Sequence, residues 1–335
     1  MKVIIVCCYL LVSANLVFAS EVNVYSARKE ALIKPLLDKY TEQTGVDVNL
    51  ITGKADALIQ RMVLEGINSP ADLLLTVDVG RLHRAKQLNL LAPVESKILN
   101  EAIPRIYRDP EANWFGLSLR SRVIVYAKAS VSSDQLSTYE ALSDPFWKNK
   151  ICVRSSSNIY NQSLVSSLVS HLGEARTEQW AKGLVANLAR SPKGGDRDQI
   201  KAVSVGQCHL ALVNTYYLAS MLNSKISAEA EAAKKVGLFW PNQNDRGAHV
   251  NISGAGVTRS SLRKEEATRL LEYLTSAKAQ SWYAEKNHEY PVRAGVPVSE
   301  ILQQWGDFRP DSLALNMLGE LNIKAVKLMD RVGWK

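Results

Sequence analysis

The sequence predicts an α/β protein with an open, mostly parallel sheet and two domains. Strand-like and helix-like segments alternate from residue 21 onward, as in βαβ units. The 335 residues give room for two domains of ordinary size. The apolar run 123–126 is long enough for a strand that crosses to the second domain, and residues 247–257 are expected to cross back.

The first domain is expected to begin with a strand, a helix and a second strand. Residues 21–25 alternate polar and apolar side chains, as do residues 46–51. Between them, apolar residues from 32 to 40 recur at helical spacing, and Gly45 ends that helix. The next expected elements are a helix at 55–65, a strand at 73–77 and a helix that ends near residue 89.

The second domain and the C-terminal region are expected to continue this alternation. The predicted strands are 150–153, 209–213 and 238–241. The predicted helices are 136–142, 159–173, 174–188, 199–205, 216–222, 264–277, 279–286 and 311–332.

The first 19 residues have the features of a cleaved export signal. Lys2 gives a positive start, an apolar run extends to Phe18, and Ala19 is small enough for a signal peptidase. An uncleaved anchor would need about 20 apolar residues, and this run is shorter. We therefore expect cleavage after Ala19.

Removal of this signal leaves two cysteines, Cys152 and Cys208. In an exported protein, two remaining cysteines favour one disulfide. Two buried free thiols are the alternative.

An adjacent tyrosine pair follows the apolar strand that ends near residue 213. Tyr216 and Tyr217 would open a helix at the carboxyl end of this strand, where open α/β sheets place their ligands. Paired phenol oxygens suit a hard trivalent metal ion, which prefers anionic oxygen. The alternative is that both rings only fill a seam between the domains.

Other candidate residues would bind an anion. The serine-rich loop with Ser157 and Asn158 opens a helix, and helix N-termini bind anions through free N–H groups. Ordinary helix capping is the alternative for this loop. Arg28, Arg120 and Arg122 lie at strand ends or crossovers, where together they could hold a small anion.

Several function classes lack support in the sequence. The net charge of +8 is not gathered into runs of Lys or Arg, so no nucleic-acid-binding stripe is expected. The sequence has no P-loop, no G-x-S-x-G elbow and no histidine pair at zinc-site spacing. Nothing in these patterns calls for catalysis.

Eight stretches of the chain resemble, in their order and spacing, the periplasmic ferric-iron-binding proteins, which are the substrate-binding components of iron ABC importers. They are residues 24–28, 69–72, 119–123, 152–155, 194–199, 214–217, 251–254 and 287–292.

This resemblance implies the two-lobed "Venus flytrap" fold of type II periplasmic binding proteins, with two crossover strands and a ligand cleft between the lobes. The expected parts are a signal peptide at 1–19, an N-terminal lobe at 20–120 plus 250–297, and a C-terminal lobe at 121–249 plus 298–335.

The resemblance also implies a metal site. The family's tyrosine pair falls on Tyr216 and Tyr217, and a third tyrosine of one subgroup falls on Tyr160. Another subgroup uses a His and a Glu from the first lobe, but Arg28 and Val77 stand at those positions here. A three-tyrosine site is therefore expected.

A further subgroup carries His-Tyr where this chain has Lys29 and Glu30, which leaves Glu30 as an additional candidate oxygen ligand. A carbonate-like anion, held by Arg28, Arg120 or Arg122, or water would complete the coordination.

The expected function is capture of Fe(III) in the periplasm and its delivery to an inner-membrane ABC permease. The protein is expected to be a monomer without enzymatic activity. The alternative is a binding protein of the same fold for an oxyanion, a polyamine or thiamine.

Overall fold

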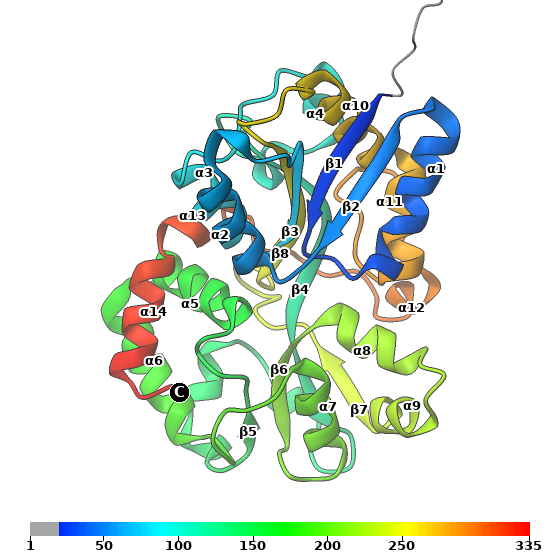
Figure 1. Cartoon of the computed structure of the whole chain (residues 1–335). Coiled ribbons are helices and arrows are strands. Elements are labelled where there is room, and N and C mark those ends of the chain that lie inside the picture. Colours follow the sequence, from blue (N-terminus) through cyan, green and yellow to red (C-terminus); the bar gives the residue numbers. More distant parts are fainter. Residues whose placement is uncertain (1–19) are drawn as a thin grey trace, which may run out of the picture.

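The computed structural model of the protein describes residues 20–335, which form two lobes joined by long strands (Figure 1). The predicted signal peptide, residues 1–19, lies outside the described residues. Among residues 20–335, no helix has the length and apolar character that crossing a bilayer requires.

One path of hydrogen-bonded strands runs through both lobes in the order β2-β1-β3-β8-β4-β6-β5, and β7 pairs with β4. The strands are β1 Glu21–Ser26, β2 Asp47–Thr52, β3 Leu73–Val77, β4 Phe115–Ala127, β5 Ile151–Cys152, β6 Leu210–Asn214, β7 Val236–Phe239 and β8 Val250–Val257. β1 is parallel to β2 and β3, and β5 is parallel to β6. β4 and β8 run antiparallel to all their neighbours, so the prediction of a mostly parallel sheet is wrong: the sheet is mixed.

Strand β4 connects the two lobes. Its first part, as far as Ser121, pairs with β8, and its second part pairs with β6 from Arg122 onward. We call the part built on β1, β2, β3, β8 and the start of β4 the first lobe, and the part built on β5, β6, β7 and the end of β4 the second lobe. Because the partner of β4 changes between Ser121 and Arg122, the chain leaves the first lobe at this point.

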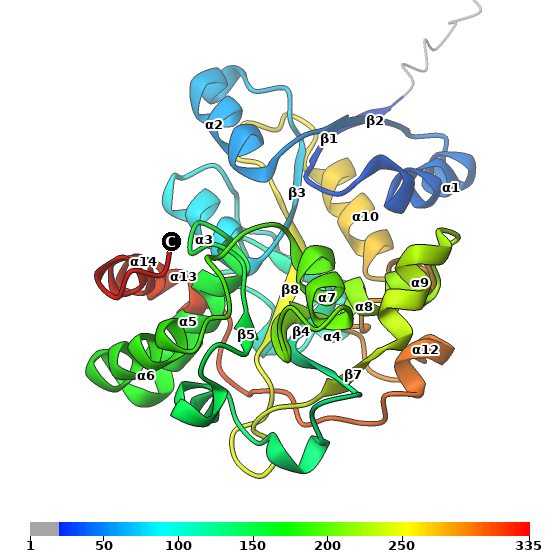
Figure 2. The ribbon, with the colours of Figure 1, turned by 90° about the horizontal axis from the view of Figure 1, so that it is seen from below.

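The helices cover the sheet of each lobe. They are α1 Lys34–Thr44, α2 Ala55–Glu65, α3 Val79–Gln87, α4 Lys97–Ala102, α5 Ile159–Leu172, α6 Glu174–Ala186, α7 Asp196–Ser204, α8 Thr215–Leu222, α9 Ser227–Lys234, α10 Lys264–Leu274, α11 Ala277–Asn287, α12 Glu300–Gln303, α13 Asn316–Glu320 and α14 Asn322–Arg331. Seen from below, α5, α6, α13 and α14 gather on one side of the crossover strands, and α8 and α9 lie on the other (Figure 2).

The prediction of a helix at residues 136–142 is wrong. This segment is extended and ends in the short 3₁₀ turn Glu140–Ser143. The Thr138 hydroxyl accepts a hydrogen bond from the N–H of Ala141 at 3.1 Å, as a helix N-cap does, so the helical turn begins only after Thr138. Leu136 and Leu142 are nevertheless buried, which explains why their spacing looked helical.

The C-terminal region packs against both lobes. Leu302, Leu315 and Leu318 join the core cluster that contains residues of α2 and β3, whereas Leu328 and Met329 of α14 join the core of the second lobe. We propose that the boundary expected at residue 298 lies instead between α13 and α14.

A disulfide joins Cys152 at the end of β5 to Cys208 just before β6. Both residues are fully buried, and their Cα atoms lie 5.8 Å apart. The expected disulfide is therefore present, and it fastens together the two parallel strands that lead to the loop before α5 and to α8.

Removal of this disulfide is expected to destabilise the protein. The two cysteines are 56 residues apart, and for a loop of this length the chain-entropy model gives about 4 kcal/mol. The Cys152→Ala/Cys208→Ala variant should therefore unfold at lower urea concentration than the wild type. A reductant should lower the wild-type midpoint and leave that of the variant unchanged; equal midpoints for the oxidised wild type and the variant would contradict the prediction.

Candidate metal centre

The three candidate tyrosines come together at the start of two helices of the second lobe. Tyr160 is the second residue of α5, and Tyr216 and Tyr217 are the second and third residues of α8. The Tyr216 hydroxyl donates to the Tyr160 hydroxyl oxygen at 3.2 Å. The rings of Tyr216 and Tyr217 lie 4.3 Å apart between centroids. The fold thus gathers side chains that are 56 residues apart in the sequence.

The local sequence explains why the tyrosine pair stands at this place. Residues Leu210–Asn214 form the fully buried strand β6, and α8 begins at Thr215 without an intervening loop. The Asn214 side-chain oxygen accepts a hydrogen bond from Arg122 of β4 at 3.1 Å. The backbone N–H of Asn214 donates to Asp196 of α7 at 2.8 Å. The end of the strand is therefore fixed from two sides, and the first turn of α8 is fixed with it.

Burial disfavours loss of the proton from the phenols of Tyr216 and Tyr217. It raises the pKa of Tyr216 well above its ordinary value, and the neighbouring Tyr160 and Tyr217 raise it further. Burial also raises the pKa of Tyr217, with Tyr160 and Asp196 acting in the same direction. Arg120 opposes the rise at Tyr216 and Arg154 opposes it at Tyr217. A ligand that binds these groups as phenolates must therefore displace their protons.

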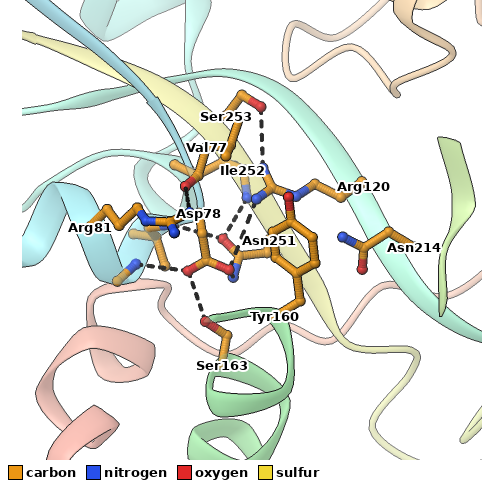
Figure 3. A network of polar contacts seen from close by, with 12 residues as sticks. Val77, Asp78, Arg81, Arg120, Tyr160, Ser163, Asn214, Asn251, Ile252 and Ser253 are labelled. Atoms are coloured by element: carbon orange, nitrogen blue, oxygen red, sulfur yellow. Dashed lines mark hydrogen bonds and ion pairs between the residues drawn. The ribbon is translucent and has the colours of Figure 1, made fainter. Parts of the chain in front are cut away.

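Two arginines lie over the ring of Tyr160. The guanidinium carbon of Arg120 is 5.8 Å from the ring centroid, and that of Arg154 is 5.4 Å away. Arg120 is 2% exposed and donates to the Ser253 hydroxyl at 3.3 Å (Figure 3). Its Nε and Nη2 groups are buried and have no hydrogen-bond partner among the described residues. Arg120 therefore keeps donors free beside the tyrosines.

Arg28 and Arg122 are held more fully by other residues. Arg28 donates to Glu289 at 2.6 Å and to Ser118 at 2.8 Å, all within the first lobe. Arg122 donates to Asp196, Asn214, Asn161 and the carbonyl oxygen of Leu212. Through these contacts Arg122 stabilises the positions of β6 and α7.

Asn158, and not Ser157, caps the helix that follows the serine-rich loop. The N-cap of α5 is Asn158, whose side-chain oxygen accepts from the N–H of Tyr160 at 3.2 Å. Ser157 is exposed, and its hydroxyl lies 3.0 Å from that of Ser155. Asn158 therefore orients the turn that carries Tyr160, and Ser157 does not. Glu30 lies in the short helix Glu30–Leu32 of the first lobe and is exposed.

Sequence reasoning missed three residues near the site: Arg154, Asp196 and Asp78. Arg154 lies two positions after the end of β5, near the carboxyl end of a strand, and this position was the available signal. Asp196 is fully buried and pairs with Arg122 at 3.3 Å and Arg154 at 3.2 Å. Asp78 belongs to the first lobe and contacts α5 of the second. No local pattern revealed either carboxylate, because each acts through residues distant in the sequence.

The arrangement is suited to a hard cation with oxygen ligands. Three phenol groups converge, and buried arginines lie beside them. Within residues 20–335, no group of three or more His, Cys, Asp and Glu side chains is placed to hold a metal ion. His249, in a small cavity with Arg120 and Tyr160, has its pKa lowered to about 3 by burial and by Arg122 and Arg120, so it is neutral.

Comparisons with known proteins support this chemistry. Residues 68–308 match the family model described as bacterial extracellular solute-binding protein. The chain is 48% identical to iron uptake protein A1 of Synechocystis over 315 residues, which cover 94% of this chain and 88% of that one. It is 28% identical to the major ferric iron-binding protein of Neisseria meningitidis, with 98% of each chain covered.

Solved structures of iron-binding proteins also resemble this chain in sequence and in fold. A Trichodesmium protein solved in complex with iron and citrate superposes with a TM-score of 0.92 and 51% identity, covering 94% of this chain and 100% of that one. The ferric binding protein of Campylobacter jejuni superposes with a TM-score of 0.90 and 38% identity, covering 94% and 100%. The resemblance found in the sequence and the two-lobed α/β fold are thereby confirmed.

Proposed function

Because this chain belongs to the bacterial extracellular solute-binding proteins, we propose that it captures ferric iron between its lobes and delivers it to an ABC permease for uptake. Its ligands are the phenolates of Tyr160, Tyr216 and Tyr217. Capture and delivery need no catalytic step, so the protein acts by binding alone.

The observation that carries this proposal is the meeting of three phenol groups at two helix N-termini. The hydroxyls of Tyr160 and Tyr216 lie 3.2 Å apart, and the ring of Tyr217 lies against that of Tyr216 at an interplanar angle of 35°. One cation can contact oxygens this close together. Three phenolates balance the charge of Fe(III), and anionic oxygen is the ligand type that a hard trivalent ion prefers.

A small anion such as carbonate would complete the coordination beside this group. Nε and Nη2 of Arg120 are buried without hydrogen-bond partners among the described residues, although Nη2 lies 3.9 Å from an Asp78 carboxylate oxygen, and the guanidinium lies over Tyr160. Nη2 of Arg28 is paired with Glu289, and Nη1 of Arg122 is paired with Asp196. Arg120 is therefore the residue that would hold an anion completing the coordination.

The proposed setting is the periplasm, and the proposed oligomeric state is a monomer. The buried Cys152–Cys208 disulfide suits an oxidising compartment, and the N-terminal apolar run suits export. The three proposed ligands come from one chain, so a single copy makes a complete site.

Ferric loading tests this proposal. Binding through phenolates should produce a visible charge-transfer band, and the purified protein loaded with ferric citrate should be coloured with one iron per chain. Elemental analysis and absorption spectroscopy measure both. A folded protein that stays colourless and iron-free after loading would eliminate the iron assignment and favour another solute for the same fold.

A further inference from the structure

Asp78 has an unusual backbone conformation at the junction of the lobes. It follows β3 and caps the N-terminus of α3 with φ 78° and ψ 125°. A residue other than glycine rarely adopts such a positive φ, and such conformations persist only where the surroundings enforce them. Here the N–H of Asp78 donates to the carbonyl oxygen of Ile252 in β8 at 2.9 Å, which ties the strained residue to the crossover.

The Asp78 carboxylate is 1% exposed and contacts four structural elements (Figure 3). One oxygen accepts from the N–H of Gly80 in its own helix at 3.0 Å and from the Ser163 hydroxyl of α5 at 2.8 Å. The other accepts from the Asn251 amide of β8 at 2.9 Å and lies 3.9 Å from Nη2 of Arg120 in β4. Asp78 thus joins both crossover strands to the second lobe.

Ser163 lies on the helix that carries the third tyrosine. Tyr160 and Ser163 are three positions apart on α5, so their side chains are neighbours on one face of the helix. Ile159, beside Tyr160, also faces the first lobe, where a Cβ built on Gly80 would lie 3.3 Å from its terminal methyl group. The N-terminus of α5 therefore rests directly on the N-terminus of α3.

According to the proposed function, on which this inference rests, the first lobe closes over a metal ion that the second lobe holds. Tyr160, Tyr216 and Tyr217 all belong to the second lobe, so closure of the first lobe over the metal needs contacts of its own. The hydrogen bond from Ser163 to Asp78 is such a contact, and it is buried beside the tyrosines.

We propose that Asp78 and Ser163 form a latch between the lobes that holds them closed and positions Tyr160 for the metal. Arg120 takes part indirectly, because Asp78 lies next to its guanidinium while that guanidinium lies over the ring of Tyr160. Asp78 and Ser163 are positioning residues and do not contact the ion.

The Ser163→Ala variant tests the latch, with Ser166→Ala as its matched control. Ser166 is in the same helix and equally buried, but its hydroxyl has no partner among the described residues. Loss of one buried hydrogen bond to a charged group corresponds to a roughly tenfold change in the equilibrium constant for lobe closure. Ser163→Ala should therefore release ferric iron to a competing chelator roughly ten times faster than Ser166→Ala, and its charge-transfer band should shift because Tyr160 is displaced.

Solution scattering of the metal-stripped proteins gives a second measurement that does not depend on iron. Ser163→Ala should have a larger radius of gyration than the wild type and Ser166→Ala. If the two variants match in release rate, absorption band and radius, the latch is ruled out. If the wild type itself takes up no iron, the proposed function fails, and the scattering comparison still decides for or against the latch.

Discussion

Replacement of Tyr217 by Phe is expected to weaken ferric iron binding by more than roughly 100-fold. Outer partners that only orient a metal ligand typically contribute 10- to 100-fold to affinity, and a direct anionic ligand should contribute more. The same loss is expected for Tyr216→Phe, which also removes the 3.2 Å hydrogen bond to Tyr160. Competition against a chelator of known affinity, followed through the charge-transfer band, measures the effect.

Tyr273→Phe is the matched control for both variants. Tyr273 is in α10 of the first lobe, and its buried hydroxyl has no hydrogen-bond partner among the described residues. The same atom is removed in all three variants, but only two of them lose a proposed ligand. Iron retention at the wild-type level in both Tyr216→Phe and Tyr217→Phe would mean that these rings serve only to pack the lobes.

The tyrosine pair could be found from the sequence because its position depends on local order. A buried strand that runs directly into a helix places the first residues of that helix at the carboxyl edge of the sheet. Tyr160, the second residue of α5, follows a loop after β5, and it was predicted from the family resemblance instead. The segments β6 and α8 were predicted close to their observed bounds, since both have strong and continuous apolar patterns.

The residues around the tyrosines could not be found in this way. Arg122 looked like a candidate for the anion, but Asp196, 74 positions later, engages it. Asp78 looked like an ordinary turn residue, and its role depends on Ser163, 85 positions later. Such pairs are set by tertiary packing, which leaves no periodic signal near either partner.

The mixed strand directions of the sheet could not be predicted for a similar reason. β4 and β8 each have an apolar pattern that fits a buried strand of either direction. Their antiparallel pairing follows from the return of the chain from the second lobe: Asn251 of β8, 131 positions after Arg120 (251 − 120 = 131), pairs with that residue of β4. The pattern predicted the strands, and only the long-range topology determined their direction.

Acidification is the second change expected to have a large effect on iron binding. Both phenols are protonated in the metal-free protein at neutral pH, since the ordinary pKa of tyrosine is about 10 and burial raises the pKa of Tyr216 and Tyr217 further. Each must lose its proton to bind as a phenolate, and each proton released makes the affinity fall tenfold per unit of decreasing pH. These two residues alone should therefore weaken binding about a hundredfold between pH 7 and pH 6.

The slope of log affinity against pH counts the phenolates that form. Tyr216→Phe retains enough affinity for this measurement at high iron concentration, and its slope should be smaller than that of the wild type by one proton. Both slopes need correction for protonation of the competing chelator. An affinity that does not change with pH, or a slope that is the same in the wild type and in Tyr216→Phe, would show that Tyr216 does not bind the ion as a phenolate. A reduced slope would instead place the Tyr216 oxygen on the metal as a phenolate. Displacement of the proton from a buried phenol is favoured by a cation of high charge, because the attraction between cation and phenolate grows with that charge.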